Sequence, residues 1–150
     1  MIHRRIHIDG WVADCWFSQG DYDEADILFA LKNCEAEESI VERVTHNMRE
    51  PYAQNTGFTY SNADMRRSVM VIGPATSGEE FFNSLIHEML HLASHIADHY
   101  GYSMTGESFA YLIGDIAGDL ADIACKLSCP QCRNQRGVPG LLLPLLHGKN

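Results

Sequence analysis

The spacing of apolar residues along the chain predicts a mixture of strands and helices. Residues 6–17 combine alternation with aromatic side chains, which predicts a strand. Two acidic stretches, 23–32 and 35–48, repeat apolar residues every three or four positions and predict two amphipathic helices. Short apolar runs at 58–60 and 68–72, separated by turn-forming residues, predict two further strands.

The strongest helical patterns lie in the second half of the chain. Ser77 is followed three residues later by Glu80, which predicts a capping box at the start of a helix that runs to Tyr100. A second periodic run extends from Phe109 to Leu127. The pattern as a whole therefore predicts an α+β fold, in which a small sheet of short strands packs against two long helices.

The composition and charge of the chain argue against a nucleic-acid-binding protein and a membrane protein. The 150 residues are 45% hydrophobic and carry a formal net charge of −9, with the eleven Lys and Arg scattered. This length fits one domain, and the charge would repel phosphate backbones, so we expect no nucleic-acid partner. No apolar run approaches the roughly 20 residues of a membrane span, and the first residues lack the apolar core of a secretory signal. We therefore expect a cytoplasmic protein without a membrane partner; the pattern does not indicate an oligomeric state.

The best candidate for chemistry is the sequence His87-Glu88-Met89-Leu90-His91 on the predicted helix. Histidines four apart project from one helical face about one turn apart, so both imidazoles can bind one tetrahedral zinc ion. Glu88 points in another direction and can act as a general base toward a metal-bound water. The motif therefore predicts zinc as the cofactor and hydrolysis as the reaction.

The alternative is that two histidines stand four apart by chance on a polar face. The neighbouring residues argue against chance, because idle imidazoles and a carboxylate on a largely buried helix would carry a desolvation cost. The apolar residues around the motif are Phe81, Phe82, Leu85, Ile86, Met89, Leu90, Leu92 and Ile96.

The third zinc ligand has to come from outside this helix. His95 lies eight residues after His87, about 12 Å along the helix axis, so one ion cannot easily bind both, and His99 is farther still. A carboxylate on the next helix is the remaining common solution, and Glu107 begins that helix.

A stripe of small residues follows Glu107 at helical spacing. We expect these residues to let the two long helices approach closely and to bring the Glu107 carboxylate toward the histidines. The alternative is an exposed glutamate in a first turn, favoured by the helix dipole. The small residues are Ala110, Gly114, Ala117 and Ala121.

The motif resembles that of the zincin metallopeptidases, and more narrowly the gluzincins, in which a later helix supplies a glutamate. The stretch from Glu107 to Gly114 is also similar to small uncharacterised His-Glu-x-x-His proteins of phages and mobile elements. The resemblance covers about residues 66–125, the expected metal core. It includes a strand before the metal helix, which in zincins lies along the substrate.

Because the length fits one domain and no domain boundary is visible, we expect residues 1–150 to form a single domain, which the resemblance makes zincin-like. The resemblance implies that His87, His91 and Glu107 bind zinc and that Glu88 is the catalytic base. The chain departs from many gluzincins at position 111, where Tyr111 replaces an aspartate that orients a histidine. Asp98, Asp115 and Asp119 are candidates for that role. Tyr100, Tyr102, Tyr111 and His99 are candidates for stabilising an oxyanion.

The cysteines form a second possible metal element. Cys129 and Cys132 have the spacing of a zinc-binding pair, with Cys125 one turn earlier. A zinc ribbon would need another close pair, which the sequence lacks, so we expect reduced thiols.

Three functions are compatible with these patterns. The first is a zinc metallopeptidase that cleaves a peptide or protein substrate with Glu88 as general base. The second is a non-catalytic zincin-fold module that binds a partner protein and uses zinc structurally, and a closed fourth coordination position would favour it. The third is amide hydrolysis on a small molecule.

Overall fold

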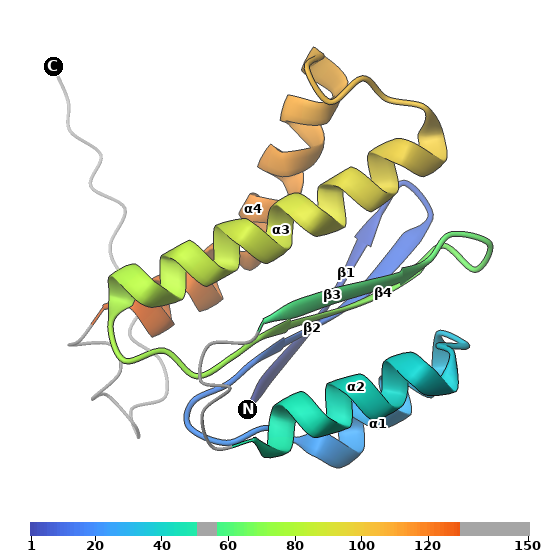
Figure 1. Cartoon of the computed structure of the whole chain (residues 1–150). Helices are drawn as coiled ribbons and strands as arrows, with labels where there is room; N and C mark the ends of the chain where they lie inside the picture. The colour runs from blue at the N-terminus through green and yellow to red at the C-terminus, as the bar shows by residue number, and fades with distance from the viewer. Residues whose placement is uncertain (51–56, 130–150) are drawn as a thin grey trace, which may run out of the picture.

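The computed structural model describes residues 1–50 and 57–129. The described residues form an α+β fold with four strands and four helices (Figure 1). The strands are β1 (Ile2–Ile8), β2 (Trp11–Phe17), β3 (Phe58–Asn62) and β4 (Arg67–Ile72). The helices are α1 (Glu24–Asn33), α2 (Glu38–Arg49), α3 (Gly78–Tyr100) and α4 (Glu107–Ser128). The α+β class predicted from the sequence is confirmed.

The first predicted strand is in fact a hairpin. Residues 6–17 were expected to form one strand, but Asp9 and Gly10 turn the chain between β1 and β2 with φ angles of 48° and 80°. Positive φ at both central residues is the signature of a two-residue type I′ turn, for which Asp-Gly is a preferred sequence. The prediction of a single strand was therefore wrong.

The four strands form one mixed sheet in the order β1-β2-β4-β3. The β1–β2 and β3–β4 pairs are antiparallel, whereas β2 and β4 are parallel. Because β4 is hydrogen-bonded on both sides, it has no edge to offer a substrate. The strand before the metal helix therefore cannot lie along a substrate by strand pairing, and β3 is the edge strand on that side of the sheet.

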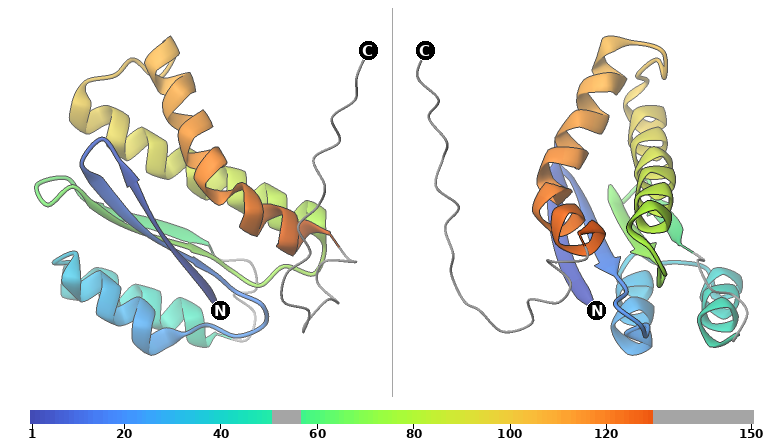
Figure 2. Two further views of the ribbon diagram at one scale, coloured as in Figure 1. Left: turned by 180° about the vertical axis from the view of Figure 1, so that it is seen from behind. Right: turned by 90° about the vertical axis from the view of Figure 1, so that its left-hand side faces the viewer.

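Helices cover both faces of the sheet (Figure 2). The α3 helix packs on β3 and β4, and α4 packs beside it on β1, whereas α1 and α2 lie on the opposite face. Alternation along β4 supplies both cores, because Met70 and Ile72 face α3 and α4 while Val69 and Val71 face α1 and α2.

The long helices are antiparallel and come very close at one end. A Cβ atom on Gly78, the first residue of α3, would collide with the carbonyl oxygen of Ser128, the last residue of α4. Glycine is therefore required at this position for the close approach. The six-residue loop from Gly101 to Gly106 joins the helices at the other end, next to Glu107.

Candidate functional site

Helix α3, which carries the histidine motif, has well-defined ends. The Ser77 hydroxyl oxygen accepts a hydrogen bond from the Glu80 amide at 3.1 Å, which confirms the predicted N-cap. At the C-terminus Gly101 is left-handed, with the Tyr102 amide donating to the Ala97 carbonyl at 2.8 Å and the Gly101 amide donating to the Asp98 carbonyl at 3.3 Å. These two bonds form a Schellman motif, so the helix frame that holds the site is fixed at both ends.

His87 and His91 come together on an exposed flank of α3. Their Nε2 atoms lie 3.1 Å apart, and the ring centroids are 4.7 Å apart. Two nitrogens bound at about 2.0–2.1 Å to one tetrahedral zinc ion would be about 3.3 Å apart, so the pair is close to the spacing that a shared ion requires. The same distance also fits a hydrogen bond between two neutral imidazoles.

The burial of the motif differs from the expectation. Both histidines are exposed, whereas the Glu88 between them is only 5% exposed. The desolvation cost inferred from the apolar neighbours therefore applies to Glu88 and not to the imidazoles, because a helix that packs on a sheet by one face keeps its outer flank in water.

Strand β3 and the residue before it build the surroundings of Glu88. The Thr59 hydroxyl donates a hydrogen bond to Glu88 Oε2 at 2.8 Å. A Cβ on Gly57 would lie 2.9 Å from Glu88 Cγ and 3.0 Å from Oε1, so glycine at this position leaves room for the carboxylate. Glu88 Oε2 therefore accepts a hydrogen bond from Thr59, whereas no described residue donates a hydrogen bond to Glu88 Oε1.

The structure does not bring Glu107 to the histidine pair. In the described parts of the chain no three His, Cys, Asp or Glu side chains are grouped closely enough to hold a metal ion. Glu107 is exposed at the start of α4, and α4 begins beyond the end of α3. The last residue of α3, Tyr100, is itself about 14 Å from His91 along the helix axis. In addition, α4 packs on the β1 side of α3, whereas Glu88 faces β3 on the other side.

The stripe of small residues on α4 does not pack against α3, so that expectation was wrong. Ala110, Gly114, Ala117 and Ala121 are all on the solvent side of α4, and a Cβ on Gly114 would meet no atom within 4 Å. Larger apolar side chains at other positions make the buried face of α4 because they exclude more water. They are Phe109, Leu112, Ile116, Leu120, Ile123 and Leu127.

A chain of polar side chains ends at His95, one turn after His91. The Ser61 hydroxyl lies 2.8 Å from His95 Nδ1 and 2.7 Å from the Ser68 hydroxyl, which accepts a hydrogen bond from Trp11 Nε1 at 2.8 Å. Burial, and to a smaller extent the neighbouring His91, lower the pKa of His95 below its usual value. Neither this chain nor the role of Thr59 was predicted from the sequence.

A signal for both hydroxyls was nevertheless present in the sequence. Phe58, Thr59, Tyr60 and Ser61 alternate aromatic and hydroxyl side chains, and residues two apart on a strand share one face. In the structure Phe58 and Tyr60 pack against the core under α1 and α2. Thr59 and Ser61 face α3 instead and bond Glu88 and His95.

The other candidates from the sequence lie elsewhere. The Tyr100 hydroxyl donates to the Asp9 carbonyl at 2.6 Å, and the His99 ring packs edge-on against Trp11 at 5.4 Å between centroids. Tyr111 is 70% exposed on α4. The three aspartates that were candidates for orienting a histidine, Asp98, Asp115 and Asp119, form no side-chain hydrogen bond with His87 or His91. None of them is therefore placed to orient these imidazoles.

The cysteines show no metal cluster within the described residues. Cys15 and Cys34 are buried free thiols, and burial raises the pKa of each, which makes them poor nucleophiles. Cys125 is exposed and Cys129 is half-buried at the end of α4, while Cys132 lies outside the described residues. Cys15, Cys34 and Cys125 are free in the structure, and the expectation of reduced thiols stays a prediction.

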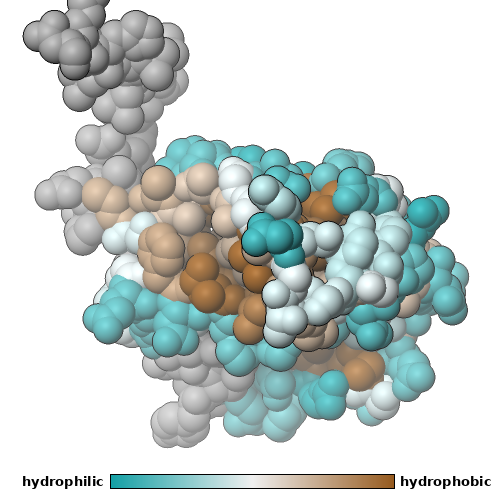
Figure 3. Space-filling model, turned by 90° about the horizontal axis from the view of Figure 1, so that it is seen from above, coloured by the Kyte–Doolittle hydropathy of each residue, from teal (hydrophilic) through white to brown (hydrophobic). Residues whose placement is uncertain are grey.

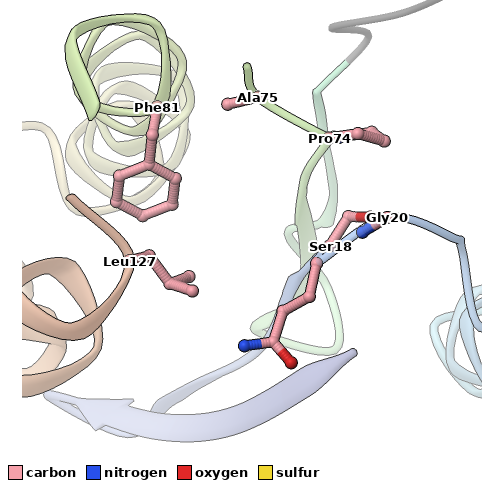
Figure 4. Close-up of a pocket in the computed structure, with 7 residues that line it drawn as sticks. Ser18, Gly20, Pro74, Ala75, Phe81 and Leu127 are labelled. Atoms are coloured by element: carbon pink, nitrogen blue, oxygen red, sulfur yellow. Dashed lines mark hydrogen bonds between the residues drawn. The ribbon is translucent and has the colours of Figure 1, made fainter. Parts of the chain in front are cut away.

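A small depression of about 150 Å³ lies near the N-terminus of α3 (Figure 4). Phe81 of α3 and Leu127 of α4 line it on one side, opposite the segment that begins at Ser18 after β2. The Ser18 hydroxyl donates to the Asp21 carbonyl at 3.0 Å and is therefore not an activated nucleophile. Because none of the described residues in its wall has a titratable side chain, we do not place the predicted chemistry in this depression.

The outer face of α3 carries exposed apolar side chains, and a brown area is visible on this side of the molecule in Figure 3. Phe82, Ile86 and Leu90 are 46–53% exposed and recur every four residues along α3. Each of the last two directly precedes a histidine of the pair, so this apolar stripe lies about 100° around the helix from the imidazoles.

Comparison with protein-family models, with curated proteins and with solved structures gave no match. None of the helices that the structure describes is both long and apolar enough to cross a membrane.

Proposed function

We propose that this protein is a zinc-dependent hydrolase, a zincin-like metallopeptidase in which His87 and His91 bind the metal and Glu88 is the general base. The observation that carries the proposal is the convergence of the Nε2 atoms of two exposed histidines, 3.1 Å apart, next to Glu88, which is only 5% exposed. Zinc held there would polarise a substrate carbonyl and make water more acidic. The sequence pattern favours Glu107 as the third ligand, but Glu107 lies beyond the end of α3, so we name His87 and His91 as the protein ligands.

The surroundings of Glu88 fit the role of a base. The Thr59 hydroxyl donates to Oε2, so Oε1 is the atom that can take a proton from the attacking water and pass it to the leaving amine. Since the Thr59 bond restrains the carboxylate, Oε1 is held in one place rather than sampling several rotamers.

The sheet fits a polypeptide substrate. Among the described strands β3 is unpaired on one side, and it lies beside the half of α3 that carries Glu88. An extended peptide can pair with such a strand edge through main-chain hydrogen bonds. A small amide would not use that edge, so we favour a peptide or protein substrate over the small-molecule alternative.

The test is hydrolysis of fluorescein-labelled casein by the zinc-loaded full chain, with zinc content measured in parallel. Glu88→Gln should keep the zinc and the fold, because the amide oxygen still accepts from Thr59, but should lower the rate about 10²–10⁴-fold. His87→Gln and His91→Gln should lose zinc. The matched control is His46→Gln, an exposed histidine on α2, which should behave as the parent does. Undiminished hydrolysis by Glu88→Gln would contradict the mechanism.

The second candidate is a non-catalytic module that binds a partner protein. The stripe of Phe82, Ile86 and Leu90 favours it, because exposed apolar side chains that line up on one helix are typical of interaction surfaces. This candidate predicts that the parent binds zinc tightly without any hydrolysis and that Glu88→Gln changes nothing.

A further inference from the structure

The hydrogen bonds that link Trp11, Ser68, Ser61 and His95 all run in one donor-to-acceptor direction. Trp11 Nε1 can only donate, so Ser68 accepts from it. Ser68 is 1% exposed, and within the described residues its other hydrogen-bonding neighbour is Ser61. If Ser61 donated to Ser68, the buried Ser68 proton would have no acceptor. The Ser68 hydroxyl therefore donates to Ser61, because an unsatisfied buried donor is costly.

This direction fixes the proton on His95. The Ser61 oxygen accepts from Ser68, which leaves the Ser61 proton to bond His95 Nδ1 at 2.8 Å. Only in this arrangement does every hydroxyl proton of the chain take part in a hydrogen bond. A neutral imidazole that accepts at Nδ1 carries its proton on Nε2.

The donor nitrogen faces away from the sheet. The two nitrogens of an imidazole point in divergent directions, so Nε2 points away from Ser61 on β3. Nε2 has no hydrogen-bond partner among the described residues, and the His95 and His91 ring centroids are 6.3 Å apart. The Nε2–H group is therefore an unoccupied donor one helical turn from the histidine pair.

We propose that His95 is a catalytic residue whose Nε2–H donates a hydrogen bond to the substrate carbonyl oxygen as negative charge develops on it, and that Ser61, Ser68 and Trp11 hold the required tautomer. The role rests on the proposed hydrolase function; the tautomer does not. A donor that is already oriented stabilises an oxyanion without reorganisation during the reaction, which is why preorganised donors contribute strongly to catalysis. The sequence motif alone assigns no such donor.

The first experiment measures the tautomer in the metal-free full chain by nitrogen-15 NMR of labelled histidine, with the His95 signals assigned from their absence in His95→Gln. We expect a single Nε2–H tautomer in the parent. Ser61→Ala should convert it to the mixture typical of an exposed histidine. The matched control is Ser94→Ala, because Ser94 lies on the same helix but bonds the Leu90 carbonyl. A proton on Nδ1 in the parent overturns the proposal.

The second experiment measures kcat, KM and zinc content with fluorescein-labelled casein. His95→Phe should lower kcat about 10²–10³-fold with KM and zinc content unchanged. His95→Gln should recover part of kcat, since its amide places a donor nitrogen near the position of Nε2. The matched control His99→Phe, one turn later, should keep the parent kcat.

An unchanged kcat in His95→Phe overturns the catalytic role, and so does loss of zinc, which would make His95 a ligand. If the parent does not cleave casein, the catalytic role is overturned together with the proposed function for this substrate. The NMR measurement still decides, independently of activity, whether Ser61 holds the His95 tautomer.

Discussion

The two faces of the sheet bury apolar side chains in the same way but treat polar groups differently. On the face under α3 and α4, Glu88, Ser68 and the Trp11 indole all have hydrogen-bond partners. On the opposite face the Trp16 indole nitrogen is buried without a partner among the described residues. Trp11 and Trp16 lie on the same strand, so the difference comes from the facing elements.

This difference indicates that one face of the sheet contributes only to stability, whereas the other also holds the candidate site. A buried carboxylate costs free energy unless it is hydrogen-bonded, and strand β3 supplies the donor that Glu88 needs. The core under α1 and α2 contains no buried carboxylate among the described residues. We therefore expect changes on the α1–α2 face to affect stability alone, and changes on the α3 face to affect stability and activity together.

The largest expected effect on stability is that of Leu31→Ala on α1. Leu31 is fully buried, and truncation should lower the free energy of unfolding by about 2–5 kcal/mol. Zinc affinity and activity per folded molecule should not change. Urea denaturation and chelator competition would measure the two quantities. The matched control is Phe29→Ala on the same helix, which is 65% exposed and should have little effect. A loss of zinc affinity in folded Leu31→Ala would break the proposed separation.

Gly57→Ala should have the next largest effect. The added Cβ would lie 2.9 Å from both Glu88 Cγ and the Val71 carbonyl oxygen, which predicts a cost of about 1–3 kcal/mol and a displaced carboxylate. Casein hydrolysis should therefore fall as well. The control is Gly114→Ala, where no atom lies within 4 Å and the helix should gain about 0.5–1 kcal/mol. Parent-like stability and hydrolysis in Gly57→Ala would show that β3 does not confine Glu88.

A smaller effect is expected from Asp14 on β2, which bonds two side chains of β1. Burial raises the pKa of this carboxyl, but hydrogen bonds from Arg5 and His3 outweigh that effect, and the pKa is below its usual 3.8. Since the folded pKa is depressed, the stabilisation is complete above about pH 4 and is lost as the pH falls through the folded value.

Asp14→Asn should consequently lower stability by about 1 kcal/mol at pH 7, a value reduced by the exposure of Arg5 and His3. The difference from the parent should shrink at acidic pH. Urea denaturation as a function of pH would measure it, with Asp64→Asn in the exposed turn after β3 as the control. A difference that stays constant down to about pH 2 would argue against this pairing.

The sequence predicted most elements but few of the contacts between them. Periodicity located both long helices and the Ser77 cap, because these features depend on residues within a few positions of each other. The polar chain could not be predicted in the same way. Ser61 and Ser68 bond because the β3–β4 register places them directly opposite each other, and register depends on tertiary pairing.

The position of Glu107 relative to the histidines could not be predicted from the motif. The spacing after His91 and the small residues on α4 favoured a ligand, but composition does not determine which side of α3 the next helix will cover. That choice follows from where the larger apolar side chains of α4 can be buried, and they are buried over β1.

The smallest expected effect is therefore that of Glu107→Ala on zinc affinity. With α4 on the β1 side of α3 and Glu107 exposed beyond the C-terminus of α3, removal of the carboxylate should change the affinity less than about threefold. His91→Gln, measured beside it, should reduce affinity strongly, because it removes one of the two converging nitrogens. Competition with a chromophoric chelator measures both variants, and circular dichroism checks that each is folded. A decrease of about tenfold or more in Glu107→Ala would mean that zinc binding draws α4 toward the histidines. The third-ligand hypothesis from the sequence would then be correct, and α4 would belong to the same functional unit as β3 and α3.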